Sequence, residues 1–238
     1  MANIIIVESK NDKHFMNALV NRLNIKNTEI DSPICLESDD YVCLDGVDPN
    51  PLKPTKLITK LKDVKTEIQK KGIEKIGIII DMDNNSQTTR IEMINNSIAE
   101  AFSDARRIET IRNISSFVRI SYEAFEIQVS CFFTNVEGSG ELETVLRNIA
   151  TKPSVYANCL ESWKSCLLSN GKSISDKDYT KFWISNYIRF DTCSISEAKQ
   201  AGKYCSMSNF EYILTKDIFN LDSPLLNDLR DYLMLFRS

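Results

Sequence analysis

The sequence predicts an α/β fold with a mainly parallel sheet flanked by helices, because short apolar runs alternate with stretches of helical spacing. Residues 3–7 and 75–80 are such runs, rich in isoleucine and apolar on both faces, as buried strands are. Apolar residues then recur at helical spacing from residue 11 and over 86–105. The 238 residues, 42% of them hydrophobic, suffice for one sizeable core.

The other elements of the first 150 residues follow from local patterns. A short strand is expected at 34–36, and the prolines, glycine and acids between 39 and 54 predict an inserted loop. A lysine-rich helix is expected over 55–70. Residues 117–134 are rich in β-branched and aromatic residues that partly alternate, which predicts a hairpin or two successive strands.

Nearly all of the sequence after residue 140 has helical spacing. The expected helices cover about 141–150, 155–168, 177–189, 195–205 and 224–236. We therefore predict an α/β domain at 1–150 and a helical C-terminal extension at 151–238, packed on it as a cap.

Composition and charge restrict the classes of function. A net charge of -4 argues against a protein that coats nucleic acid through bulk positive charge. No stretch approaches the roughly 18 apolar residues of a membrane span, so we expect a cytoplasmic protein without membrane contact. Seven cysteines form no Cys-x-x-Cys pair, and reduced thiols are the simplest interpretation. Neither of the standard glycine-rich phosphate-binding motifs occurs.

Acidic residues stand at or after the ends of the predicted strands, where ligands gather in open α/β sheets. Glu8 ends the first strand, and Asp12 lies one turn into the next helix. Asp81 and Asp83 end the strand at 75–80, and in an extended chain both would face one site. Glu141 follows the last strand. Converging carboxylates repel one another without a cation, and oxygen-only ligands select Mg²⁺ or Mn²⁺.

Two motifs carry a resemblance to a known family. The segments Val7-Glu8-Ser9-Lys10-Asn11-Asp12 and Ile80-Asp81-Met82-Asp83 look like the Toprim domain of topoisomerases, primases and overcoming-lysogenisation-defect nucleases. Ser139-Gly140-Glu141 matches the later Ser-x-Glu of that nuclease branch, and Gly140-Glu141-Leu142-Glu143 is similar to a stretch of small stand-alone Toprim-like proteins. The likeness covers about residues 1–150. Ser9 stands where the family usually has glycine.

The resemblance implies metal-assisted hydrolysis of phosphodiester bonds, with nucleic acid as the substrate and Mg²⁺ or Mn²⁺ as the cofactor. Stand-alone relatives carry a tail lysine, for which Lys181 is the nearest match, and it would stabilise charge on the phosphate. A separate basic partner protein could supply the positive charge that this chain lacks. The catalytic set implied is Glu8, Asp81, Asp83, Glu141 and Lys181, and the metal ligands are Glu8, Asp81 and Asp83, with Asp12 and Glu141 able to support a second ion.

Simpler interpretations stay open beside this one. Asp-x-Asp after a strand often only caps the next helix. Asp12 could act only as a first-turn acid that the helix dipole stabilises. Ser139 could cap the helix that begins near Glu141. The alternative function is a non-catalytic module of the same fold that senses a metal or nucleotide, or binds another protein. The sequence does not distinguish DNA from RNA or define the oligomeric state.

Overall fold

The computed structural model describes residues 2–35 and 52–237 and confirms the predicted α/β class. It divides into two compact units, of which the first comprises Met1–Thr134 with Asn227–Ser238 and the second Asn135–Leu226. The division falls at the end of the last strand rather than near residue 150. The final helix belongs with the sheet, although its sequence pattern alone could not assign it to either unit.

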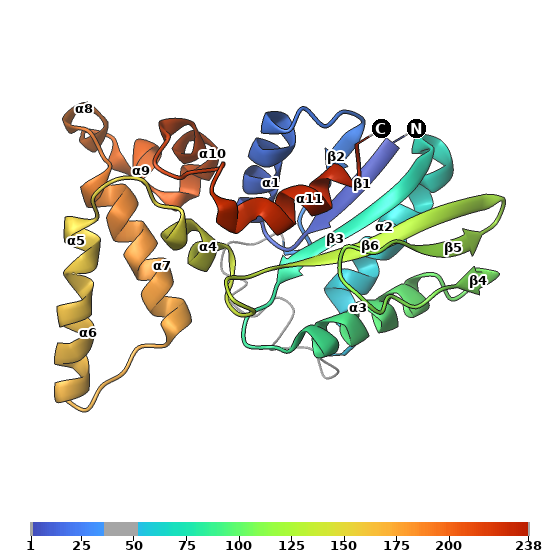
Figure 1. Cartoon of the computed structure of the whole chain (residues 1–238), viewed down its shortest axis with the longest axis horizontal. Helices are drawn as coiled ribbons and strands as arrows, with labels where there is room; N and C mark the ends of the chain where they lie inside the picture. The colour runs from blue at the N-terminus through green and yellow to red at the C-terminus, as the bar shows by residue number, and fades with distance from the viewer. Residues whose placement is uncertain (1, 36–51, 238) are drawn as a thin grey trace. The chain divides into compact units, whose positions relative to one another are not determined.

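The first unit contains a six-stranded sheet in the order β2-β1-β3-β6-β5-β4 (Figure 1). The pairs β1–β2, β1–β3 and β3–β6 are parallel, and β4 and β5 add antiparallel strands at one edge. The predicted mainly parallel sheet is therefore confirmed. The strands are β1 (Ala2–Val7), β2 (Thr28–Ile30), β3 (Ile73–Asp81), β4 (Arg107–Ile108), β5 (Val118–Tyr122) and β6 (Phe125–Thr134).

Helices cover both faces of this sheet. Within the sheet, β2 and β3 lie on either side of β1. The α1 helix (Lys10–Arg22) lies between β1 and β2 in the sequence, and the α2 helix (Thr55–Lys71) lies between β2 and β3. Because crossovers between parallel strands are right-handed, α1 and α2 lie on opposite faces. The α3 helix (Gln87–Ala101) shares the buried cluster of α2. The α11 helix (Asn227–Met234) packs on the face opposite that cluster, where Tyr232 stacks on Phe132 at 5.2 Å between ring centroids.

The segment after α1 differs in part from what the sequence predicts. The strand expected at 34–36 is misplaced, because the second strand is β2 at Thr28–Ile30. The backbone N–H groups of Ile34 and Cys35 nevertheless donate to the carbonyls of Val7 and Glu8, which continues the edge of β1. The loop expected at 39–54 lies mainly in residues 36–51, outside the described residues.

The second unit is helical where the structure describes it, as expected for this part of the chain. The stacked rings of Trp183 and Tyr187 lie in its core. A disulfide joins Cys193 to Cys205, so the expectation of reduced thiols is wrong for this pair. Sequence spacing could not reveal a pairing that depends on how two short helices fold back on each other. The helical segments are α4 (Leu142–Asn148), α5 (Val155–Asn158), α6 (Leu160–Ser169), α7 (Asp176–Asn186), a π-helical turn (Tyr187–Asp191), α8 (Ile195–Ala198), α9 (Ala201–Tyr204), α10 (Phe210–Ile213) and 3₁₀ turns at Met207–Asn209, Leu214–Lys216 and Pro224–Leu226.

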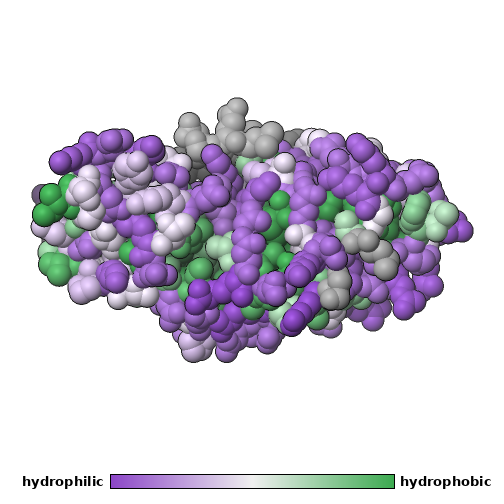
Figure 2. Space-filling model, turned by 90° about the horizontal axis from the view of Figure 1, so that it is seen from above, coloured by the Kyte–Doolittle hydropathy of each residue, from purple (hydrophilic) through white to green (hydrophobic). Residues whose placement is uncertain are grey.

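The surface agrees with the composition. Hydrophilic residues dominate the face shown in Figure 2, with smaller hydrophobic areas between them. Among residues 2–35 and 52–237, no helix has the length and apolar character needed to cross a membrane.

Candidate functional site

The carboxyl ends of β1 and β3 form a topological switch point, where the chain leaves neighbouring strands for helices on opposite faces. Open α/β sheets bind their ligands in the crevice outside such a point. Glu8 directly follows β1, and Asp81 is the last residue of β3. On the next strand, Thr134 is the register partner of Asp81. The fold therefore brings the predicted acids of the first unit to one edge of the sheet.

Glu8 lies in the middle of this acidic cluster, which we define as Glu8, Asp12, Asp81 and Asp83. Its Oε2 accepts a hydrogen bond from the backbone N–H of Asp81 at 3.1 Å. Burial, and after it the negative charges of Asp12 and Asp83, raise the pKa of Glu8 from 4.5 to about 8. The Asp81 N–H and the Arg90 guanidinium act in the opposite direction but do not prevail.

Asp12 is buried and forms a capping box with Ser9 at the start of α1. Its Oδ2 accepts from the Ser9 backbone N–H at 2.9 Å and from the Ser9 hydroxyl at 2.6 Å. The Ser9 Oγ in turn accepts from the Asp12 N–H at 3.2 Å. This arrangement gives Ser9 a structural task at the position where the resembled family usually has glycine. It also supports the role of Asp12 as a first-turn acid, while its role as a metal ligand stays a prediction.

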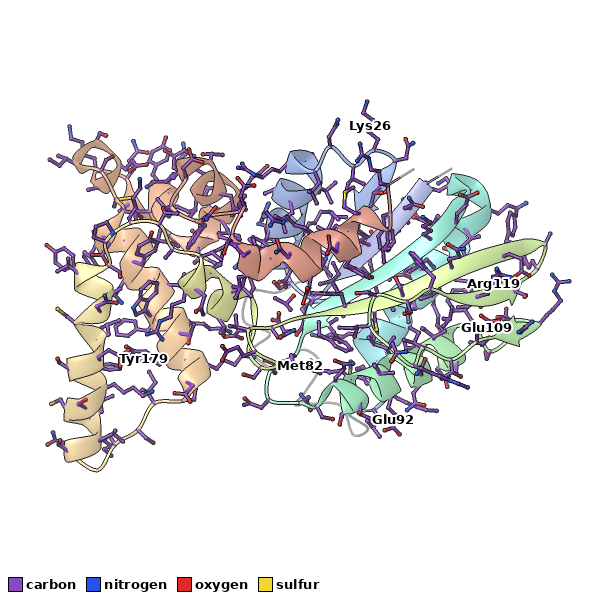
Figure 3. All side chains as sticks on the ribbon, viewed as in Figure 1. Lys26, Met82, Glu92, Glu109, Arg119 and Tyr179 are labelled. Carbon is purple, nitrogen blue, oxygen red and sulfur yellow. A yellow bond between two sulfur atoms is a disulfide. The ribbon has the colours of Figure 1, made fainter. Side chains whose placement is uncertain are left out.

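The prediction that Asp81 and Asp83 face one site assumed an extended chain, which does not continue to Asp83. Asp83 has a left-handed backbone with φ 51°, so the chain is no longer extended there. Asp and Asn tolerate this conformation better than most residues. Met82, labelled in Figure 3, turns away from the acids into the core as predicted, and only 4% of it is exposed.

Arg90 belongs to this site although no motif in the sequence predicts it. It lies in α3, is 1% exposed, and its Nη2 is 2.8 Å from Asp83 Oδ2. A buried arginine is rare without a partner, since removing the charge from water is costly. The ion pair fixes Asp83 and adds a positive charge beside the acidic cluster.

Thr134 adds a neutral oxygen to the same edge. It is 2% exposed, and in the described part of the chain its Oγ1 has no hydrogen-bond partner. Because Thr134 and Asp81 are register partners on adjacent strands, their side chains emerge on the same face of the sheet. Its position as the last residue of β6 is the one sequence signal that could have suggested it.

The remaining predicted residues, Glu141 and Lys181, lie in the second unit and form an ion pair there. Lys181 Nζ is 3.7 Å from Glu141 Oε2, and Lys177 Nζ is 3.2 Å from the same oxygen. Lys177 and Lys181 are four residues apart on α7, a spacing that places them on one face and could have identified Lys177 from the sequence. That Glu141 shares a metal with Glu8 stays a prediction.

Glu141 is held at the start of α4 by a constrained turn. It is the N-cap residue of α4, so the interpretation of Ser139 as the cap is wrong. The preceding Gly140 has φ 95°, and a Cβ there would lie 2.6 Å from Thr144 Oγ1, so glycine is required. Burial and the nearby Glu143 raise the pKa of Glu141 to about 7 despite Lys181 and Lys177.

The side-chain oxygens of the acidic cluster suit a hard cation, but the carboxylates lie too far apart to bind one together. All its side-chain donors are oxygens, as Mg²⁺ and Mn²⁺ prefer. In the described residues, however, the only trio of potential ligand atoms within 4.8 Å of one another is Cys193, Glu197 and Cys205. The two cysteines are joined in a disulfide and so offer no thiolate. The carboxylates of the acidic cluster would have to move closer together around an ion.

The fold and its acidic edge define an α/β protein with a candidate cation site, built from carboxylates, at a topological switch point. Comparison with protein families matches residues 2–237 to the family described as protein of unknown function (DUF3226), and the chain belongs to this family. No curated protein and no solved structure matches the chain.

Proposed function

We propose that the protein is a Mg²⁺- or Mn²⁺-dependent phosphodiester hydrolase of the Toprim type that acts on nucleic acid. The observation that carries the proposal is the position of Glu8 among other acids at the switch point, where burial and then the negative charges of Asp12 and Asp83 raise its pKa. Such mutual repulsion is what a bound divalent cation would relieve. The nature of the substrate rests on the motif resemblance.

In this proposal, Glu8, Asp81 and Asp83 are the metal ligands, and the buried oxygen of Thr134 is a neutral donor at the same edge. When bound, the ion would polarise the phosphodiester and lower the pKa of a coordinated water. Arg90 holds Asp83 through the ion pair at 2.8 Å, which limits the rotamers of that carboxylate. Glu141 and Lys181 keep the additional roles that the resemblance implies, as a support for a second ion and as a cation for phosphate.

A second candidate function is a non-catalytic module that senses a metal or nucleotide, or that binds a protein. Arg90 favours this alternative, because its guanidinium already neutralises Asp83. The absence of a close trio of carboxylates in the described residues favours the forms of this module that bind a nucleotide or a protein rather than a metal. A free-standing nuclease usually has a basic track, which the net charge of -4 does not suggest.

Metal binding and cleavage must be tested separately. Isothermal titration with Mg²⁺ and Mn²⁺ would compare the wild type with Asp81→Asn and with Glu92→Gln, an exposed acid of α3 labelled in Figure 3. Cleavage of single-stranded and duplex DNA and RNA would use the same three proteins, with EDTA as the metal-free control.

The hydrolase proposal expects metal binding and cleavage by the wild type and Glu92→Gln, and loss of both in Asp81→Asn. Metal binding without cleavage of any of the four substrates would favour the sensing module. Equal cleavage by all three proteins would mean contamination and would reject the assignment of Asp81.

A further inference from the structure

A pocket in the second unit is independent of the acidic cluster. Its volume is about 490 Å³, which falls in the range of pockets for small molecules. Helix α7, the π-helical turn after it, α9 and the residues just after α9 supply the walls. The residues that matter here are Phe182, Arg189, Phe190, Ala201, Cys205 and Met207.

Most of these walls are apolar, and two of the rings are accessible. Phe182 is 41% exposed and Phe190 is 54% exposed. Each ring is supported from the side by another aromatic residue, Phe182 by Trp163 at 5.2 Å and Phe190 by Tyr156 at 5.8 Å between ring centroids. Exposed rings that contact another aromatic ring offer a flat apolar surface that a ligand can cover.

Arg189 introduces a positive charge that its own unit does not neutralise. In the part of the chain that the structure describes, its Nη1 is buried and has no hydrogen-bond partner. The acid two residues along, Asp191, is engaged elsewhere, since its carboxylate accepts from the backbone N–H groups of Tyr156 at 2.9 Å and Ala157 at 3.0 Å. A buried donor without an acceptor is costly, and an anionic ligand in the pocket that Arg189 lines would supply a charge partner for its guanidinium.

The backbone around Arg189 is also unusual. Arg189 lies in the π-helical turn Tyr187–Asp191 that continues α7. Such turns are rare and occur frequently at functional sites, because the extra residue shifts side chains out of the regular helical positions. The opposite wall is tethered, since Cys205 is bonded to Cys193.

We propose that this pocket binds a small organic anion that combines one carboxylate or phosphate group with a flat apolar body. The other polar lining residues are Ser185, Asn186 and Ser206, so no acid among the lining residues would repel the anionic group. Arg189 would form charge-assisted hydrogen bonds with the anionic group, while Phe182 and Phe190 would cover the apolar body. The volume limits the occupant to a small molecule.

Two fluorescent probes that differ by one charged group test the proposal. 8-Anilino-1-naphthalenesulfonate carries an anionic sulfonate, and N-phenyl-1-naphthylamine has the same rings without it. Each would be titrated into wild type, Arg189→Gln, Arg189→Lys and the control Lys172→Gln, which removes a positive charge from a residue outside the pocket lining. Circular dichroism and thermal melts of each variant show whether it is folded.

We expect Arg189→Gln to weaken the sulfonate probe at least about tenfold, as loss of a charge-assisted hydrogen bond predicts, and to change the neutral probe less than about twofold. Arg189→Lys should retain part of the affinity, and Lys172→Gln should behave as wild type. Equal affinity of wild type and a folded Arg189→Gln for the sulfonate probe would overturn the proposal.

A measurement on wild type alone covers the case in which Arg189→Gln does not fold. Phenyl phosphate, phenylacetate and uncharged phenol would compete with the sulfonate probe. The proposal expects displacement by one or both anions at concentrations at which phenol has no effect, and the stronger of the two anions identifies the preferred group. Displacement by phenol as effective as that by the anions would refute it, and so would failure of both anions to compete.

Discussion

Replacing Glu8 by glutamine should stabilise the metal-free protein at alkaline pH. The carboxyl of Glu8 has its pKa raised from 4.5 to about 8 in the folded state, mainly by burial and then by Asp12 and Asp83. A raised pKa means that the folded state favours the protonated carboxyl. The resulting contribution to stability is therefore fully present below about pH 4.5 and is lost as the pH rises through 8.

The size of the effect follows from the same shift. One pH unit corresponds to about 1.4 kcal/mol, so the wild type should lose on the order of 4 kcal/mol of unfolding free energy between pH 4.5 and pH 8 through this group. Glutamine at position 8 cannot ionise and keeps a shape close to that of the protonated acid. The variant should match the wild type near pH 4.5 and exceed it in stability by a few kcal/mol at pH 9.

Urea unfolding in EDTA at pH 4.5, 7 and 9 would measure this difference, with Glu92→Gln as the matched control for the loss of one exposed carboxylate. The control should follow the wild-type curve at each pH. Parallel pH profiles for wild type and Glu8→Gln would refute the reasoning, because they would show that Glu8 ionises alike in the folded and unfolded chain.

Three other predictions concern individual contacts. Arg90→Met should lower the free energy of unfolding in urea by about 3–5 kcal/mol, because it leaves Asp83 without its buried partner. Adding Asp83→Asn should recover part of that loss, and strict additivity of the two substitutions would contradict the coupling. Gly140→Ala should lower the free energy of unfolding by about 1–3 kcal/mol, because the backbone there is left-handed and the new Cβ would overlap the side chain of Thr144. Gly202→Ala, with open space around its Cβ, should not have this effect, and equal losses in the two variants would contradict the packing argument. Mg²⁺ at 100 times its Kd should stabilise the wild type by about 2.7 kcal/mol in a thermal melt but not Asp81→Asn, and an equal shift in both would exclude Asp81 as a ligand.

The sequence allowed the sheet to be predicted because its central strands have simple causes. A buried parallel strand needs apolar residues on both faces, and 3–7 and 75–80 supply them. The strand at Thr28–Ile30 was missed because it has only three residues, and Thr, Glu and Ile in sequence do not form a recognisable apolar run. The assignment of α11 to the sheet depends on contacts such as Tyr232 with Phe132, which helical spacing does not encode.

The candidate site was only partly predictable for a related reason. Strand ends are local features, so the sequence could identify Glu8 and Asp81. The contact of Arg90 with Asp83 occurs where Asp83 has a left-handed backbone, a turn that strand alternation does not predict. Arg90 also stands beside the apolar residue Ile91 on a helix, where a charged residue would ordinarily be assigned to the solvent face.

The charge balance of the acidic cluster bears on how many ions the proposed site would hold. Its four carboxylates would carry four negative charges if all were ionised. Protonation of Glu8 below its pKa of about 8 and the adjacent Arg90 reduce this to a net charge of two negatives near neutral pH. Binding of an ion through Glu8 would release that proton and return the cluster to three negatives, of which one divalent cation would balance two and a second would leave one positive charge in excess. Because the proton and the metal ion compete for Glu8, metal affinity would rise as the pH approaches 8.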